Sequence, residues 1–154
     1  MFPQHGCQSD VTTLYLPGLF LGEVRTARDC VGCVLSREDP DICSTATLLT
    51  SELATNALIH GDTRNTACPK TGLLTDPRPF SVTVGLLARE IDVVVSGKGA
   101  HYAAPRVRRN RAWDEDGRGL AWVEALATTW GTYGDQESRT VWFSLDRTTA
   151  ATPG

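Results

Sequence analysis

Three polar side chains recur every fourth residue from position 52 to position 60, at the end of a segment (42–59) where the spacing of apolar residues predicts a helix. Glu52, Asn56 and His60 would lie along one face of that helix, because residues four apart are neighbours on its surface. A carboxylate and a carboxamide one turn apart offer oxygen ligands to Mg²⁺, which binds few protein groups together with phosphate oxygens. The same carboxylate could orient or deprotonate a hydroxyl nucleophile. A solvated polar face on a surface helix is the alternative, and His60 also suits a helix C-terminus, where a cation is favoured.

Two glycine-rich segments follow downstream, Gly97-Lys98-Gly99 and Gly117-Arg118-Gly119-Leu120. Glycines two apart allow a backbone to approach a flat ligand closely, because no Cβ intervenes. The second segment directly precedes a predicted helix, whose free backbone N–H groups and dipole suit a phosphate. Each segment alone is compatible with a simple turn. Together with the polar stripe on the helix they predict a nucleotide site.

The elements that must position these residues follow from apolar periodicity. Strands are expected at residues 11–16, 80–87, 91–95, 130–133 and 140–145, and helices at 22–35, 42–59 and 120–129. Residues 61–79 are predicted to form a loop, and residues 96–117 a lid or mobile segment. This order predicts an α+β fold, a two-layer sandwich with helices packed on one face of a mixed β-sheet. One domain, residues 11–146, would lie between a flexible N-terminus (1–10) and a disordered tail (147–154).

Composition excludes several classes of protein. The chain has 154 residues, a net charge of −3 and 41% hydrophobic residues, which fits one globular domain and argues against binding through many phosphate contacts to nucleic acid. No apolar run reaches the length of a membrane span, and the first ten residues lack signal-peptide features, so a cytoplasmic protein is expected. The five cysteines are expected to be free thiols with a structural role, packed as small hydrophobes.

An arginine-rich stretch within the predicted lid leaves one alternative open. Arg106, Arg108, Arg109 and Arg111 lie beside Trp113, and basic residues next to aromatic ones can grip single-stranded nucleic acid. Three acidic residues follow at once, however, and the whole chain is acidic. A solvated lid is the preferred interpretation, a phosphate or partner contact the next, and nucleic-acid binding the least favoured.

In this order and spacing the motifs resemble those of the GHKL ATPase superfamily, and within it the anti-sigma-factor/serine-protein-kinase family with its histidine-kinase-like (Bergerat-type) fold. The stretch 51–57 with His60-Gly61 looks like that family's N-box. Gly97-Lys98-Gly99 looks like the end of its first glycine box, and residues 117–120 look like its second. The closing strand 140–143 is similar to the family's last strand. The resemblance covers roughly residues 11–145.

The resemblance implies a role for each matching residue. Asn56 would coordinate Mg²⁺ on the nucleotide phosphates, and Glu52 would act as the base or orienting group for the serine that receives the γ-phosphoryl group of ATP. Thr140 would help to hold adenine. The remaining nucleotide-lining positions would be His60, Val95, Gly97, Gly99, Gly117, Arg118, Gly119 and Leu120. The implied partners are a sigma factor and an anti-anti-sigma (antagonist) protein, and the implied assembly is a homodimer in which Arg25 and Arg28 are candidate contacts.

The chain departs from the family pattern where the first glycine box begins. The family has an aspartate two residues before the first glycine, which accepts a hydrogen bond from the adenine amino group, and Val95 stands at that position here. An unpaired ligand donor costs about 1–3 kcal/mol, or roughly 5- to 150-fold in affinity. Two functions therefore stay open: a Mg-ATP-dependent serine kinase, or a degenerate protein-binding module. The resemblance also predicts that Val95→Asp would strengthen nucleotide binding.

Overall fold

Residues 10–60, 65–98, 118–135 and 137–147 are described by the structure, a computed structural model. Its elements, in chain order, are β1 (Asp10–Leu16), α1 (Glu23–Val34), α2 (Pro40–Thr55), the π-helical turn η1 (Asn56–His60), β2 (Phe80–Leu86), β3 (Glu90–Lys98), α3 (Arg118–Leu126), β4 (Thr129–Gly134) and β5 (Ser138–Asp146). Every strand and helix expected from the sequence is present. β3 runs three residues beyond its expected end, so it includes Gly97.

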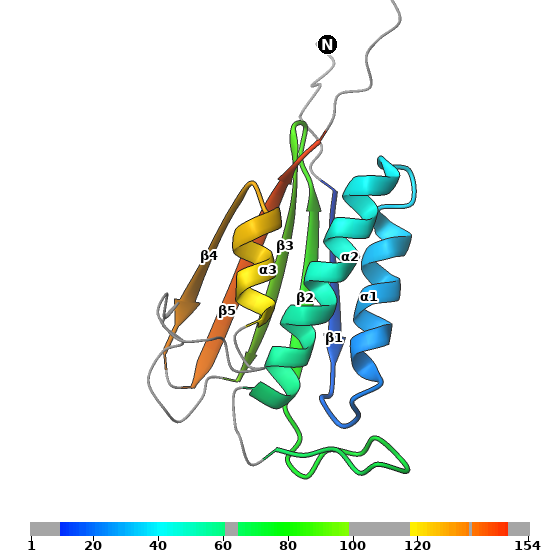
Figure 1. The fold of residues 1–154 in the computed structure, drawn as a ribbon, viewed down its shortest axis with the longest axis vertical. Coiled ribbons are helices and arrows are strands. Elements are labelled where there is room, and N and C mark those ends of the chain that lie inside the picture. Colours follow the sequence, from blue (N-terminus) through cyan, green and yellow to red (C-terminus); the bar gives the residue numbers. More distant parts are fainter. Residues whose placement is uncertain (1–9, 61–64, 99–117, 136, 148–154) are drawn as a thin grey trace, which may run out of the picture.

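The sheet is antiparallel throughout the described strands, in the order β1-β2-β3-β5-β4. The expectation of a mixed sheet was wrong, and the topology explains why. Between β1 and β2 the chain makes two helices, α1 and α2, which together return it to the end of the sheet where β1 finished (Figure 1). The single helix α3 does leave β3 and β4 pointing the same way, but β5 lies between them, so these two strands never pair.

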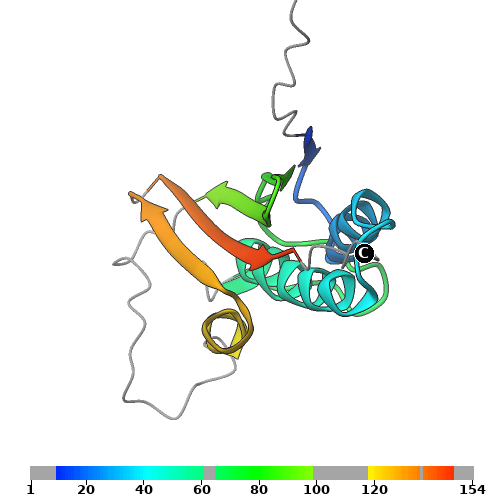
Figure 2. The same ribbon diagram turned by 90° about the horizontal axis from the view of Figure 1, so that it is seen from above.

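All three α-helices cover one face of the sheet, as the view from above shows (Figure 2). Alternate strand residues point into the space between the two layers, and α2 lies between α1 and α3 (Figure 1). The buried apolar strand residues are Phe80, Val82, Val84, Ile91, Val93, Val95, Phe143 and Leu145, and the buried helix residues include Ala27, Val31, Leu49, Leu53 and Val123. Full burial of one such aliphatic side chain contributes about 1.5–3 kcal/mol. The α+β class with helices on one face is therefore confirmed.

The opposite face of the sheet carries polar side chains that bond to one another across neighbouring strands. The hydroxyls of Thr13 and Thr83 are 3.0 Å apart, and the Ser144 hydroxyl donates to Asp92 at 2.5 Å. Thr83, Asp92 and Ser144 are each one position out of phase with a core residue of their own strand, namely Val82, Val93 and Phe143. Because strand side chains alternate between faces, this polar face points away from the helices.

Two carboxylates organise the helix layer. The Glu23 side chain is buried and accepts hydrogen bonds from the backbone N–H groups of Gly18, Leu19 and Phe20 at 2.9, 2.6 and 2.7 Å. It thereby folds the β1–α1 loop onto the first turn of α1. Asp39 caps α2 by accepting from the backbone N–H of residue 41 at 2.8 Å, the usual role of aspartate before a helix.

The C-terminal end of β5 is tied to the helix layer by Arg147. Its guanidinium contacts both carboxylate oxygens of Glu38, at 3.2 and 2.6 Å, and donates to the carbonyl oxygen of Leu87 at 2.6 Å. Arg147 was expected to be the first residue of a disordered tail, and these contacts show that this expectation was wrong for Arg147. The rest of the predicted tail, and residues 1–9 of the predicted flexible N-terminus, lie outside the described residues. Among the helices described, none is long and apolar enough to cross a membrane.

Candidate functional site

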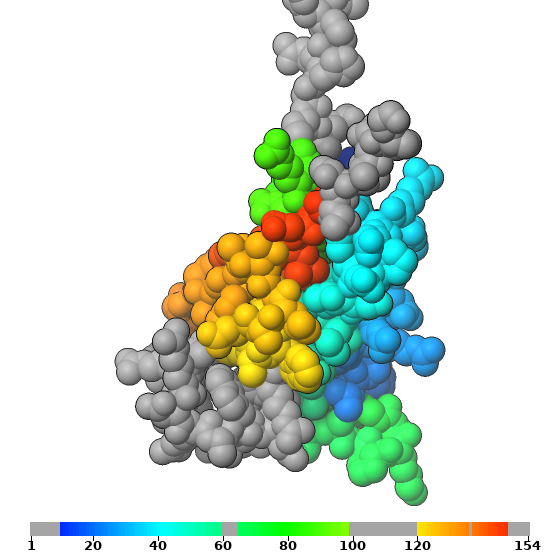
Figure 3. Space-filling model, turned by 45° about the horizontal axis from the view of Figure 1, so that its top comes forward, coloured from blue at the N-terminus to red at the C-terminus, as the bar shows by residue number. Residues whose placement is uncertain are grey.

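The polar stripe on α2 lies on the flank that faces away from α1. Thr47 marks the α1 side, because its Cγ2 atom lies 3.5 Å from where a Cβ on Gly32 of α1 would be. At 100° per residue, Glu52 and Asn56 are about 140° and about 180° around the helix axis from Thr47. Both are half-buried. The stripe therefore faces the side on which α2 packs against α3, and Figure 3 shows these two helices in contact on the surface.

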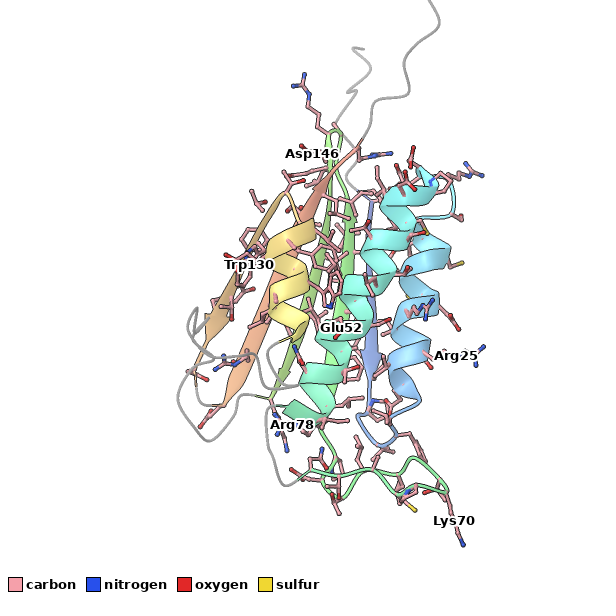
Figure 4. The ribbon with its side chains drawn as sticks, in the orientation of Figure 1. Arg25, Glu52, Lys70, Arg78, Trp130 and Asp146 are labelled. Carbon is pink, nitrogen blue, oxygen red and sulfur yellow. The ribbon has the colours of Figure 1, made fainter. Side chains whose placement is uncertain are left out.

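Two of the segments singled out in the sequence end close together in the fold. The C-terminal end of α2 with η1 and the end of β3 both lie toward the lower end of the molecule in Figure 1, and α3 begins above them. A Cβ on Gly97 would lie 3.5 Å from the Cβ of Ala57, the residue after Asn56. Figure 4 shows Glu52 one turn higher on α2, at the level of the N-terminal half of α3. The helix stripe and the first glycine segment are thus neighbours.

Arg78 joins the two segments directly. Its Nε donates to the carbonyl oxygen of Ala57 at 3.0 Å, and its Nη2 donates to the carbonyl oxygen of Lys98 at 2.9 Å. The side chain is 2% exposed and lies beneath the end of α2 (Figure 4). Its backbone N–H donates to the carbonyl oxygen of Gly18 at 3.0 Å, and Gly18 has φ +69° and no room for a Cβ against Arg78. Arg78 therefore holds the helix end at a set position relative to the end of β3.

Asn65 supplies a second cap on the same helix end. Its Nδ2 donates to the carbonyl oxygen of Leu58 at 2.6 Å, while its Oδ1 accepts from the backbone N–H of Asp76 at 2.9 Å. The last carbonyls of a helix have no partner within it. Side chains from the following loop supply partners for two of them here. Neither Asn65 nor Arg78 was recognised from the sequence. The one available signal was the position of Arg78 between Pro77 and Pro79, which restrict the backbone around it.

The helix-facing side of β3 has no polar side chain near the candidate site. Val93 and Val95 are buried, Val95 being 4% exposed, and Gly97 follows on the same face. Because Val95 points into the core between the layers, an aspartate there would be buried among apolar groups. The expectation that Val95→Asp would strengthen nucleotide binding is therefore not supported by its position. Ser96 lies on the opposite face, because side chains alternate along a strand.

Thr140 is not where the resemblance implied. It pairs with Ser96 in the β3–β5 register, and the two hydroxyl oxygens are 2.8 Å apart on the polar face of the sheet. Val141 and Phe143 point to the opposite face of the sheet from Thr140. Val141 packs against the core and Phe143 lies inside it. A hydroxyl on the face away from α2 cannot share a cavity with Asn56. The adenine contact expected of Thr140 is contradicted by this geometry.

The second glycine segment is described only in part. Arg118, Gly119 and Leu120 form the first turn of α3, so their backbone N–H groups have no partner within the helix. The Leu120 side chain is buried in the core, so only its backbone remains available to a ligand. Gly99 and Gly117 lie outside the described residues, as do the lid arginines. His60 ends η1, but its side chain is not among those described.

The cysteines meet the expectation only in part. Cys30, Cys33, Cys43 and Cys68 are free thiols; Cys30 and Cys43 are half-buried, whereas Cys33 and Cys68 are exposed. Burial raises the pKa of the Cys30 thiol, and the nearby Cys33 adds to that effect. A hydrogen bond from the Thr71 side chain lowers the pKa of Cys68. In the part of the chain that the structure describes, no group of three or more His, Cys, Asp or Glu residues could hold a metal ion.

Neither a protein-family model nor a curated protein matches the sequence. The features of this chain that bear on function are the α2 stripe, the end of β3 beside it, and the Arg78 side chain that bridges the two.

Proposed function

We propose that the chain is an anti-sigma-factor-like transcription regulator of the GHKL type, with a histidine-kinase-like ATPase fold. In this proposal it binds Mg-ATP and phosphorylates a serine of an anti-anti-sigma partner. It would act in the cytoplasm as a homodimer that also binds a sigma factor. The observation that carries the proposal is that Asn56 and Glu52 share one flank of α2, and that Arg78 bridges the end of this helix to the end of β3 through Ala57 and Lys98.

Each described residue would have a separate task. The Asn56 amide oxygen suits a Mg²⁺ ligand, since this cation takes few protein oxygens and keeps phosphate oxygens as the others. Mg²⁺ would neutralise charge on the phosphates, the main requirement of phosphoryl transfer. Glu52, one turn before Asn56 on the same flank, would accept the proton of the attacking serine hydroxyl or orient it. The free N–H groups in the first turn of α3 would hold phosphate oxygens.

Calorimetric titration of the full chain with Mg-ATP tests this proposal. We expect saturable heat for the wild type, and a loss of roughly tenfold or more in affinity for Asn56→Ala, since a ligand to the phosphate-bound cation is removed. Ser44→Ala is the matched control, because Ser44 is an exposed polar residue near the other end of α2; its affinity should not change. Wild-type affinity in Asn56→Ala would refute the assigned role of the stripe.

A second function is favoured by one specific observation. The helix-facing residues at the end of β3 offer no acceptor for the adenine amino group, and the Thr140 hydroxyl is on the other face of the sheet. The chain would then be a degenerate member that sequesters a sigma factor or another regulator without nucleotide. Absence of heat with millimolar Mg-ATP in a chain that is folded by circular dichroism would select this function over the kinase.

A further inference from the structure

One row of residues crosses the sheet at the candidate site. Phe80 of β2 pairs with Gly97 of β3, Gly97 pairs with Arg139 of β5, and Arg139 pairs with Gly134 of β4. Arg139 is in phase with Val141 and Phe143, so its side chain leaves the sheet on the helix-covered side. Because glycines stand on both neighbouring strands, Arg139 has no side chain beside it in this row on either of them.

The Arg139 side chain carries a polar atom that needs a partner. The residue is half-buried, its Nε is fully buried, and no acceptor among the described residues bonds to that nitrogen. Burial lowers the pKa of this guanidinium, which reflects the cost of keeping its charge away from water. Buried donors in native proteins almost always have an acceptor, so the unpartnered Nε marks Arg139 as an unusual side chain in this fold.

The side chains around Arg139 differ in hydrogen-bonding character from those that a site for adenine would need. The adjacent helix-facing residues of β3, Val93, Val95 and Gly97, provide no acceptor side chain. The one polar side chain in the row is a donor. Adenine presents an amino group at C6, which needs an acceptor, whereas guanine presents O6 and N7, both acceptors, and an arginine edge bonds to that pair bidentately.

We infer that Arg139 reads the base of the bound nucleotide and selects a purine with a carbonyl at C6, so that guanine nucleotides bind more tightly than ATP. The inference rests on the proposed nucleotide site and concerns only which base that site selects. Arg139 would act here as a specificity-determining residue. The two Nη groups of this half-buried side chain would donate to O6 and N7 of the base.

Calorimetry with the full chain and the Mg²⁺ complexes of GTP, ITP and ATP tests the inference. A good bidentate pair discriminates between bases by about 5- to 150-fold, so GTP should bind the wild type at least about fivefold more tightly than ATP. ITP has the carbonyl but not the 2-amino group of guanine, so it should bind like GTP. Arg139→Met should lose most of this preference, whereas Arg89→Met, an exposed arginine in the β2–β3 turn, should keep it.

A second variant, which adds an acceptor instead of removing the donor, tests the inference if Arg139→Met does not fold. Gly97→Asp places a carboxylate directly across from Arg139, and its Cβ would make ordinary 3.5 Å contacts with Ala57 and Phe80. It should pair with the arginine, abolish the preference for GTP and favour ATP. Equal binding of GTP and ATP by the wild type, or a preference unchanged in both variants, would overturn the inference and leave the nucleotide site intact. Binding of none of the three nucleotides would instead overturn the proposed nucleotide site itself.

Discussion

Replacing Arg78 with methionine removes the guanidinium while keeping most of the hydrocarbon stem. Two carbonyl oxygens, those of Ala57 and Lys98, then lose their donors at 3.0 and 2.9 Å. An acceptor left buried without a partner costs about 1–3 kcal/mol. Lys98 is exposed, so water can hydrate its carbonyl, and the cost falls mainly on Ala57. We expect a loss of about 2 kcal/mol in the free energy of unfolding.

Thermal and urea denaturation followed by circular dichroism measure this loss. For a domain of this size, 1 kcal/mol corresponds to roughly 2–4 °C, so Arg78→Met should lower Tm by roughly 4–8 °C. Arg78→Lys keeps the charge but offers a point donor instead of the planar fork, so it should reach one carbonyl and lose about half as much. Arg89→Met, at an exposed turn position, should stay within about 0.5 kcal/mol of the wild type. If Arg78→Met proves as stable as Arg89→Met, the bridge does not hold the helix end to the strand.

Three further predictions follow from single contacts. Val95→Asp should destabilise the fold by about 3 kcal/mol or more, because its carboxylate would be buried without a partner, and denaturation should detect this with no gain in Mg-ATP affinity by calorimetry. Asn65→Ala should cost about 1–2 kcal/mol in urea denaturation, because it leaves the Leu58 carbonyl uncapped. The thiolate of Cys68 is favoured by its hydrogen bond from Thr71, so iodoacetamide should alkylate the wild-type thiol at lower pH than in Thr71→Val, as read by mass spectrometry of the Cys68 peptide.

The order and type of the elements could be predicted because their signals are local. The alternation of Phe80, Val82 and Val84 with polar residues has the period of a strand with one buried face, and all three are buried. The helix α2 likewise follows from the spacing of its apolar residues. The common flank of Glu52 and Asn56 follows from their separation of four residues. Whether the sheet is mixed depends on which strands become neighbours, and no local pattern placed β5 between β3 and β4.

The end of α2 shows a contact that spacing alone does not reveal. A glycine after His60 is the usual signal for a helix end, and the sequence provides one at Gly61. The described carbonyls are instead capped by Asn65 and Arg78, which follow Leu58 and Ala57 by 7 and 21 residues. From the sequence alone, an arginine in a loop rich in Pro, Thr and Asp is expected to be exposed to solvent. Its burial becomes evident only when the loop is folded back under the helix.

The face on which a strand residue lies could be predicted only within its own strand. From the position of Val95 it follows that Ser96 lies on the other face and Gly97 on the same one. For Thr140 the same reasoning needs the register between β3 and β5, because a slip of one residue would exchange all side chains between the faces. With Ser96 opposite Thr140, the threonine turns away from α2 and Arg139 turns toward it. The polar group that closes the candidate site at this strand is therefore a cation and not a hydroxyl, and any ligand bound beside Gly97 must accommodate that charge.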